Sequence, residues 1–307
     1  EFRRVLFRSA TIAFTDDWRL DAARRDFTFN ALYADPLTHE LFDYHGGHDD
    51  LMKGQVRFIG KAADRIAEDH LRILRFFRFY ARFGRGAPDA QAYDACRAQA
   101  SSLMALSRER IADELLKLLG LPDPSASLEL MIAGGIFQPV IPEITTEGLE
   151  RLKLLIAREQ GAGVPPSPVR RLCALIPHGT LLAENIAARL KLSNRIRKRM
   201  AAANADDVPP MPAHETAFRL GAEAAVDRIL LDPDADAAQA VDLSNWRMPE
   251  FPLTGGGLSA LGLQAGPEIS RALNEVREGW ISENFPGADR VQEIARQTVS
   301  KFQRARQ

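Results

Sequence analysis

Arginines recur at helical spacing in one stretch of the chain, and this pattern constrains the fold more than any other feature. The positions are Arg72, Arg75, Arg78 and Arg82, which are three, three and four residues apart. On an α-helix, side chains at this spacing lie on one face. The residues between them are mostly apolar, so the pattern predicts a largely buried helix with one charged stripe. The stripe is compatible with salt bridges to acids elsewhere and with binding of an anionic ligand.

Two charged residues at the start of this stretch, Asp69 and Arg72, are one helical turn apart and can project together. A carboxylate accepts hydrogen bonds, and a guanidinium donates several in one plane. This pair could therefore read the edge of a nucleobase.

Composition narrows the class of protein. The chain has 307 residues, enough for two or more domains, and its 46% hydrophobic and 26% charged residues are ordinary for a soluble globular protein. Its net charge is −1, so any nucleic-acid surface must come from local clusters. The two cysteines, Cys96 and Cys173, fit no metal-binding spacing and are expected as reduced thiols in a cytosol. We find no apolar run long enough for a membrane span and no signal peptide.

The order of elements predicts a mainly α fold. Residues 1–9 show no clear relation to the rest of the chain and are set aside as a possible artefact or scar. Short strands are predicted at 10–14, 40–44 and 55–60, with a Gly-Gly turn and a short helix between the last two. The predicted helices after residue 60 span 61–83, 89–100, 107–120, 125–134, 146–159, 167–176, 180–190 and 193–205.

A basic cluster stands out in the second half of the chain. Residues 189–199 contain six cations and no acid. A solvated helix face is the plain interpretation of such a run, but this density in a nearly neutral chain favours a phosphate-contacting patch. The predicted RNA-binding residues are Arg189, Lys191, Arg195, Arg197, Lys198 and Arg199.

Motifs in the first half of the chain carry a resemblance. They read RRDFTFNAL at 24–32, DYHGGHDDL at 43–51, EDHLRILRFFRF at 68–79, and SRERI at 107–111 followed by EL at 114–115. In this order and spacing the chain resembles the tRNA nucleotidyltransferase and bacterial poly(A) polymerase family. These are class II members of the polymerase-β-like nucleotidyltransferases. Agreement of several ordered motifs is far more specific than any one of them.

The resemblance implies an architecture. It predicts the remnant of a small α/β nucleotidyltransferase head at 10–60, followed by an all-helical neck at 61–120 that carries the nucleotide-reading helix. A helical body at 121–207 and a tRNA-binding body and tail at 208–307 complete the expected organisation.

The resemblance also implies residue roles. Arg25 and Asp26 would hold the sugar and phosphates of the incoming nucleotide, while Asp69 and Arg72 would read its base. Arg75 and Arg78 would support that pair and the triphosphate. The residues expected to assist them are Asn30, Glu68 and Arg110.

The catalytic metal site of the family is not recognisable in this sequence. The resemblance implies Mg²⁺ held by a D-x-D pair on a strand before Thr11, which we do not find. Asp16 and Asp17 are a poor substitute because neighbouring strand residues point to opposite faces. We therefore expect an N-terminally truncated enzyme with no catalytic residue or metal ligand in this chain.

The acidic run at 232–236 is interpreted as a turn. A calcium loop would need Gly at position 237 and Glu at position 243, and the sequence has Ala and Leu there.

The expected function is addition of C and A to tRNA 3′ ends, with CTP and ATP as substrates and the cytoplasm as location. The alternatives are a poly(A) polymerase of the same family and a non-catalytic helical RNA-binding module. A helical interaction protein whose arginines make only salt bridges is a further alternative.

Overall fold

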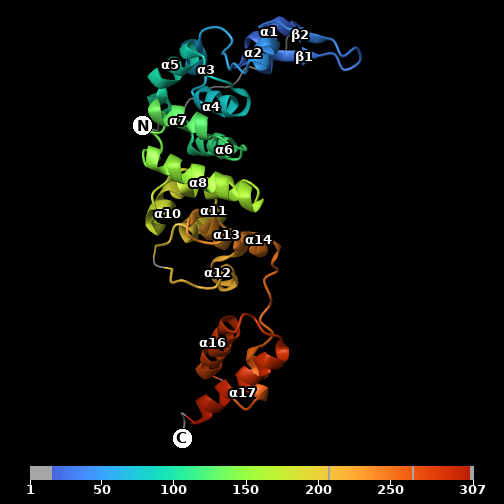
Figure 1. Ribbon diagram of the computed structural model, residues 1–307, viewed down its shortest axis with the longest axis vertical. Helices are drawn as coiled ribbons and strands as arrows, with labels where there is room; N and C mark the ends of the chain where they lie inside the picture. The colour runs from blue at the N-terminus through green and yellow to red at the C-terminus, as the bar shows by residue number, and fades with distance from the viewer. Residues whose placement is uncertain (1–15, 207, 265, 305–307) are drawn as a thin grey trace, which may run out of the picture. The chain divides into compact units, whose positions relative to one another are not determined.

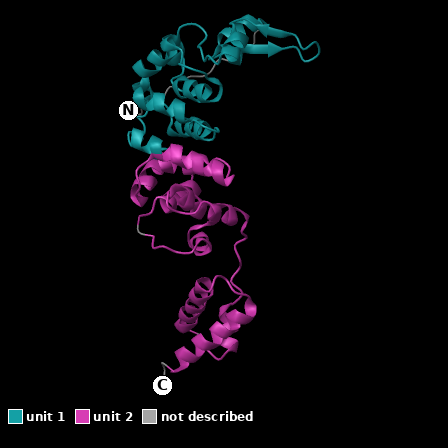
Figure 2. Cartoon of the chain, viewed as in Figure 1, with its two compact units in different colours: residues 1–150, 189–191 teal, residues 151–188, 192–307 magenta. Residues whose placement is uncertain are grey.

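The structure, a computed structural model, describes residues 16–206, 208–264 and 266–304. The strand predicted at 10–14 lies outside these residues. The chain divides into two compact units (Figure 2): residues 1–150 with 189–191 form unit 1, and residues 151–188 with 192–307 form unit 2. The finer division into head, neck, body and tail stays a prediction. No helix in the described part of the chain is both long and apolar enough to cross a membrane.

Unit 1 combines a small hairpin with helices (Figure 1). Its elements, in chain order, are α1 (Trp18–Ala23), η1 (Thr28–Ala31), β1 (Leu32–Ala34), β2 (Leu41–Asp43), α2 (Gly47–Lys53), α3 (Ala62–Glu68), α4 (Arg72–Phe83), α5 (Ala90–Ala98), η2 (Ala100–Ala105), α6 (Arg108–Leu119) and α7 (Ser125–Ala133). Helix α8 (Thr146–Ala162) begins in unit 1 and continues into unit 2.

The observed strands agree only in part with the predicted ones. Strand β2 lies inside the range predicted at 40–44, whereas β1, which pairs with it antiparallel, was not predicted. The prediction of a strand at 55–60 is wrong, because this segment makes only an isolated bridge between Phe27 and Phe58. Val56, Phe58 and Ile59 supply the apolar residues of a strand pattern, but no neighbouring strand among the described residues forms a ladder with them.

The prediction of one helix over 61–83 is also wrong. The chain leaves helical geometry at Asp69, whose backbone is extended at φ −149° and ψ 106°. The Asp69 carboxylate accepts the Leu71 N–H at 3.1 Å, so the side chain competes with the helical hydrogen-bond pattern. Asp69 therefore ends α3, and Arg72 begins α4.

The predicted Gly-Gly turn and short helix are confirmed as the start of α2. Gly46 has φ +71°, a left-handed conformation that favours glycine. A Cβ on Gly47 would lie 2.3 Å from the Thr28 carbonyl oxygen, so this position requires glycine as well. The Asp43 carboxylate accepts the N–H groups of Gly47 and His48 at 2.9 Å and caps the helix start.

Aromatic rings join the hairpin region to α4. Phe27 packs against Phe58 with ring centroids 4.7 Å apart, and against Phe79 of α4 at 5.3 Å. Phe76 and Phe77 of α4 are fully buried. The apolar faces predicted for α4 thus hold it against the segment that carries Asp26.

Helices are the regular secondary structure of unit 2 in its described residues, and they are joined by loops. Its elements are the remainder of α8, then α9 (Pro168–Leu175), α10 (Thr180–Arg189), α11 (Asn194–Ala203), α12 (Ala213–Leu220), α13 (Ala222–Leu231), α14 (Ala238–Asn245), α15 (Gly255–Ala260), α16 (Pro267–Ser282) and α17 (Ala288–Arg304). The last residue of α10 belongs to unit 1.

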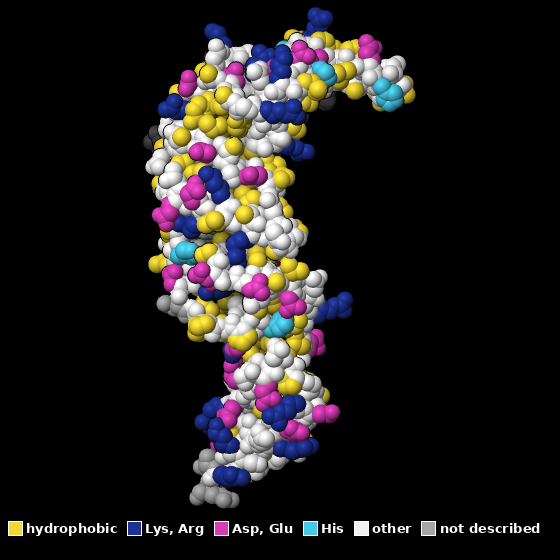
Figure 3. Space-filling view, viewed as in Figure 1, with side chains coloured by type: hydrophobic (Ala, Val, Ile, Leu, Met, Phe, Trp, Pro, Cys, Tyr) yellow, Lys and Arg dark blue, Asp and Glu magenta, His cyan; other side chains and the backbone are white. Residues whose placement is uncertain are grey.

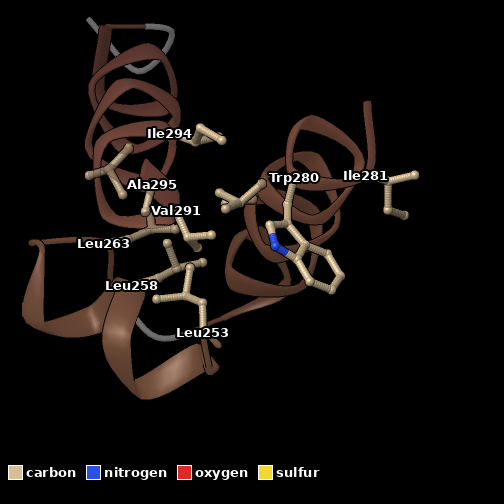
Figure 4. Packing of buried hydrophobic residues seen from close by; sticks show 11 residues of the cluster. Leu253, Leu258, Leu263, Trp280, Ile281, Val291, Ile294 and Ala295 are labelled. Carbon is tan, nitrogen blue, oxygen red and sulfur yellow. The ribbon is translucent and has the colours of Figure 1, made fainter. Parts of the chain in front are cut away.

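The last helices of unit 2 enclose a hydrophobic cluster (Figure 4). Leu253, Leu258, Leu263 and Val291 gather between the helices, beside the indole of Trp280. Trp280 is 1% exposed, and its indole N–H donates to the Pro286 carbonyl at 3.0 Å. This segment thus has a core of its own.

Cys96 and Cys173 are both buried, and both are free thiols. Burial raises the pKa of the Cys173 thiol to about 12 and also raises the pKa of Cys96. Because the thiolate is the reactive form, both thiols should resist iodoacetamide at pH 8 in the folded chain and react after denaturation. Peptide mapping of alkylated cysteines will test this, and rapid labelling of the folded chain would contradict it.

Candidate functional site

Asp26 is the centre of the candidate site. It follows α1, is 8% exposed, and accepts hydrogen bonds on both carboxylate oxygens. Its Oδ1 accepts the Phe27 N–H at 3.0 Å and the Asn30 amide at 2.9 Å. Its Oδ2 accepts Nε of Arg75 at 2.6 Å. A buried carboxylate of this kind requires such partners, and here they tie the RRD segment to α4.

A second buried carboxylate, Glu114 of α6, continues the cluster. It is 3% exposed, and its Oε2 accepts Nε of Arg78 at 2.6 Å. Its Oε1 lies 4.0 Å from Nη1 of Arg75. Both arginines also lie against Phe79, with guanidinium carbons 5.3 Å and 4.3 Å from the ring centroid. Alternating charges therefore run from Asp26 through Arg75 and Glu114 to Arg78.

The break between α3 and α4 positions the predicted base-reading residues. The Asp69 Oδ2 accepts Nη2 of Arg110 at 2.8 Å, and the Asp69 side chain remains 36% exposed. Arg72 begins α4 and donates through Nη1 to Glu68 at 2.5 Å and to the Arg65 carbonyl at 2.9 Å. The backbone N–H of Arg72 donates to the Asp69 carbonyl at 3.0 Å, so a single turn joins the two residues.

Glu68 lies between two arginines at this break. Arg65 donates to both of its carboxylate oxygens at 2.8 Å, in addition to the contact from Arg72. Burial alone would raise the pKa of Glu68, but the hydrogen bonds from Arg72 and Arg65 outweigh it and hold the pKa below its usual value. Glu68 is thus an anion that fixes both guanidinium groups.

Arg25 belongs to a separate cluster. Its Nη2 donates to Asp21 at 3.1 Å, and its guanidinium lies 5.9 Å from the centroid of the Tyr33 ring. The Tyr33 hydroxyl also donates to Asp21 at 2.7 Å. The hydrogen bonds from Tyr33 and Arg25 lower the pKa of Asp21. Arg25 is 50% exposed, so it can turn toward a ligand at little cost.

The structure therefore brings together most of the residues predicted for nucleotide binding. The cluster contains Asp26, Asn30, Glu68, Asp69, Arg72, Arg75, Arg78 and Arg110. Its arginines pair with carboxylates, as expected for a salt-bridge face, and their contacts to nucleotide stay a prediction.

Two acids that support the site were not singled out from the sequence. Glu114 lies in the SRERI…EL motif, but no role was assigned to it. Asp50, 3% exposed, accepts the Thr28 hydroxyl at 2.6 Å and Nε of Arg57 at 2.8 Å. For Glu114 the available signal was an acid among the apolar residues of 111–119, since such a group must be satisfied on folding. Asp50 follows His48 and Asp49 and carries no such signal.

Most cations of the predicted RNA-binding patch pair with acids. Arg189 contacts Glu143 at 2.5 Å, Lys191 contacts Glu109 at 2.9 Å and Arg195 contacts Glu223 at 2.7 Å. Arg199 donates to the buried Asp227 at 2.6 Å and 2.8 Å.

Arg197 and Lys198 differ from the other cations of the patch in their contacts. No ion pair joins Lys198 to a described residue, and Arg197 Nε is buried without a hydrogen-bond partner among them. On the face drawn in Figure 3, Lys and Arg lie interspersed with Asp and Glu rather than in one continuous basic area. Lys198 is therefore the cation of this segment with the clearest freedom to contact phosphate.

No Mg²⁺ ligand is assigned among the described residues. No group of three or more His, Cys, Asp or Glu side chains within these ranges could hold a metal ion. The carboxylates of the cluster are already neutralised by arginines, which is unfavourable for ligation of a second cation. None of these side chains is therefore assigned to a metal.

Structural comparison identifies the fold. The CCA-adding enzyme of Bacillus stearothermophilus, solved in complex with CTP, matches with a TM-score of 0.71 and 24% identity, over 96% of this chain and 76% of that one. The Thermotoga maritima CCA-adding enzyme complexed with tRNA matches with a TM-score of 0.62 and 19% identity, over 93% and 74%. This chain has the fold of these nucleotidyltransferases, and the predicted mainly α architecture is confirmed.

Sequence comparison defines the family. A family model described as "Poly A polymerase head domain" matches residues 4–57. A second model, described as "Probable RNA and SrmB- binding site of polymerase A", matches residues 87–147. The mitochondrial CCA tRNA nucleotidyltransferase 1 of Danio rerio is 33% identical over 293 residues, 91% of this chain and 67% of that protein. Its Homo sapiens counterpart is 31% identical over 292 residues, 91% and 66%. The chain belongs to the CCA tRNA nucleotidyltransferase family and spans about two thirds of the length of these relatives.

Proposed function

We propose that this chain acts in template-independent addition of C and A to tRNA 3′ ends. The observation that carries the proposal is the cluster in which Asp26, Arg75, Glu114 and Arg78 form a line of alternating charges beside Asp69 and Arg72. The cluster supplies cations that can bind a triphosphate, and it supplies a carboxylate and a guanidinium that can hydrogen-bond to a base. The compartment we propose is the cytoplasm, although the relatives include mitochondrial enzymes.

Base selection follows from the chemistry of Asp69 and Arg72. Cytosine and adenine each present an amino donor beside a ring-nitrogen acceptor, so one carboxylate and one guanidinium can serve both. Uracil and guanine present a carbonyl where the carboxylate needs a donor. Each Asp69 oxygen accepts one protein hydrogen bond and keeps capacity for another, so the pair can read a base without leaving its supports.

The remaining arginines would hold the triphosphate. Arg75 and Arg78 use Nε for the carboxylates of Asp26 and Glu114, and a guanidinium has five N–H donors in all. The other N–H groups can contact phosphate oxygens. Mg²⁺ is included in the proposal because phosphoryl transfer of this kind uses metal to stabilise charge, but we assign no residue to it.

Thermal shift with the four nucleotides tests the proposal. CTP and ATP should raise the melting temperature, and UTP and GTP should not, because only ligands that bind the folded state stabilise it. Equal shifts with all four nucleotides, or none, would refute base selection by this chain. Titration calorimetry with CTP provides an independent measurement.

Poly(A) polymerase is the second candidate. Poly(A) polymerase I of Haemophilus influenzae is 36% identical over 131 residues, 43% of this chain and 29% of that protein. Product length distinguishes the two functions when labelled nucleotides are offered to tRNA lacking its CCA end. An ATP-only tail that does not stop after three nucleotides would favour the polymerase.

The role of Lys198 in RNA binding can be measured by its salt dependence. Lys198→Ala should weaken tRNA binding uniformly across sequences and reduce the slope of log affinity against log salt by about one. Filter binding at several salt concentrations provides the slope. The exposed Lys53, on α2, serves as a control when replaced by Ala. An unchanged slope for Lys198→Ala would exclude a phosphate contact at this residue.

A further inference from the structure

Residues of α1 and of the β1–β2 hairpin line an aromatic cleft that includes no residue of the charged cluster. Figure 1 labels these elements. The volume of the cleft is about 310 Å³, and aromatic side chains supply much of its lining. They are Trp18 of α1, Tyr33 of β1, Phe42 of β2 and Tyr44, which comes directly after β2. Clefts of about 300 Å³ and above are the usual size of sites for small ligands.

The rings are arranged as walls rather than as a closed core. Trp18 meets Tyr33 edge to face, with centroids 5.2 Å apart and planes at 71°. Tyr33 and Tyr44 are tilted by 54° at a centroid distance of 6.3 Å. The inner sides of both tyrosines pack on the small cluster of Ala22, Ala31 and Ile59. A flat ring inserted here would find one aromatic face and a second aromatic edge.

Trp18 is the feature that ordinary packing does not explain. Its side chain is 63% exposed, although tryptophan is among the most buried residue types on average. Exposed tryptophan and tyrosine side chains at a cleft are typical of binding surfaces, because they offer large rigid contact areas. Tyr33 and Phe42 of the cleft are directly paired across the hairpin, and Trp18 contacts Tyr33 while its indole stays exposed.

One positive charge, that of Arg19, lies at the rim of the cleft and is complementary to a phosphate of a nucleic-acid backbone. The Arg19 guanidinium lies 5.4 Å from the centroid of the Tyr44 ring, and no ion pair joins it to a described residue. Two acids lie nearby: Asp35, which lines the cleft, accepts the N–H groups of Leu37 and Thr38 and stays an anion, and Asp21 accepts from Tyr33 and Arg25. Recognition here therefore depends on the rings, with Arg19 available for a single phosphate.

We propose that this cleft binds an unpaired nucleobase of single-stranded RNA, with Arg19 contacting the adjacent phosphate. The inference rests on the proposed function, since it adds a binding site for the RNA substrate to the nucleotide site. Every base has a π-face, so stacking on the exposed Trp18 indole tolerates any sequence. An aromatic cleft with one cation at its rim matches a base and its phosphate better than a strongly anionic surface.

Binding of a short fluorescent RNA tests the site. Trp18→Ala should weaken binding of a single-stranded hexamer containing C and A by about 5- to 150-fold, and Trp18→Phe should retain most of the affinity. Leu37→Ala is the matched control, because Leu37 is 89% exposed on the same hairpin and does not line the cleft. The melting temperature of each variant confirms folding. Equal affinities of wild type and Trp18→Ala, or no RNA binding by the wild type, would overturn the proposal.

Two further measurements separate stacking from charge. Arg19→Ala should reduce the salt slope of RNA binding by about one, whereas Trp18→Ala should leave the slope unchanged. A hexamer of abasic sugar-phosphate should bind wild type and Trp18→Ala equally. Acrylamide quenching should detect an accessible indole that is lost in Trp18→Phe, and a shielded Trp18 would show that other protein segments occupy the cleft, which overturns the proposal.

CTP binding distinguishes failure of the site from failure of the proposed function. Trp18→Ala should retain the wild-type thermal shift with CTP, because the charged cluster is separate. If CTP binds and RNA affinity ignores Trp18, only the cleft proposal fails. If RNA affinity depends on Trp18 but no nucleotide binds, only the proposed function fails.

Discussion

Replacing Asp69 by Ala should weaken CTP and ATP binding by about 10- to 100-fold and remove the preference over UTP and GTP. A hydrogen bond to a charged group contributes about 1.5–3 kcal/mol, and each 1.4 kcal/mol is a factor of ten. Asp69→Asn should shift preference toward UTP, because a carboxamide can donate to the carbonyl that a carboxylate rejects. Titration of all four nucleotides provides the comparison.

The control for this prediction is Asp64→Ala, in the first turn of α3. Asp64 is exposed, so its loss should change neither affinity nor selectivity. Arg110→Met should have a smaller effect than Asp69→Ala, since it loosens the carboxylate held at 2.8 Å without removing it. Unaltered discrimination between CTP and UTP in Asp69→Ala would exclude Asp69 as the base-reading residue.

Helix ends were predictable because their signals are local. Ser107, Ser167 and Ser193 were expected to begin helices, and each accepts a backbone N–H three residues later as an N-cap. The Gly-Gly turn was predictable for the same reason, since left-handed backbone favours glycine wherever it occurs.

The break at Asp69 could not be predicted by periodicity. All four arginines of the stripe lie after the break, so their spacing carries no sign of it. The break depends on Asp69 accepting the Leu71 N–H while Arg110 holds its other oxygen. Arg110 lies 41 residues along the chain, so this contact exists only after α6 packs on α4. Tertiary contacts thus override the local helical preference.

The carboxylates that pair with the arginine stripe could not be predicted from local sequence patterns either. Spacing predicted that Arg72, Arg75 and Arg78 share a face, but not that different carboxylates meet them. Asp26 lies 49 residues from Arg75, and Glu114 lies 36 residues from Arg78. The motif resemblance indicated which residues belong to the site, whereas the structure supplies the pairing that holds them.

Replacing Glu114 by Ala should lower the free energy of unfolding by about 3–5 kcal/mol and abolish nucleotide binding. Removing one partner of a buried ion pair leaves the other charge uncompensated, and Glu114 is 3% exposed beside Arg78 at 2.6 Å. The freed Arg78 would no longer hold its guanidinium group in the orientation needed for a triphosphate, and Arg75 would lose its weaker contact at 4.0 Å. Urea denaturation and CTP titration measure the two effects.

The charge and the shape of Glu114 can be separated by Glu114→Gln. The amide oxygen can still accept from Arg78, so the fold should be retained, while loss of the charge leaves Arg78 without a carboxylate partner and should favour anionic ligands non-selectively. Asp113→Ala is the matched control, because Asp113 precedes Glu114 on α6 and pairs with Lys117 at the surface. Its effect on stability should stay within about 0.5 kcal/mol. Equal destabilisation by Asp113→Ala and Glu114→Ala would show that the buried carboxylate does not organise the site.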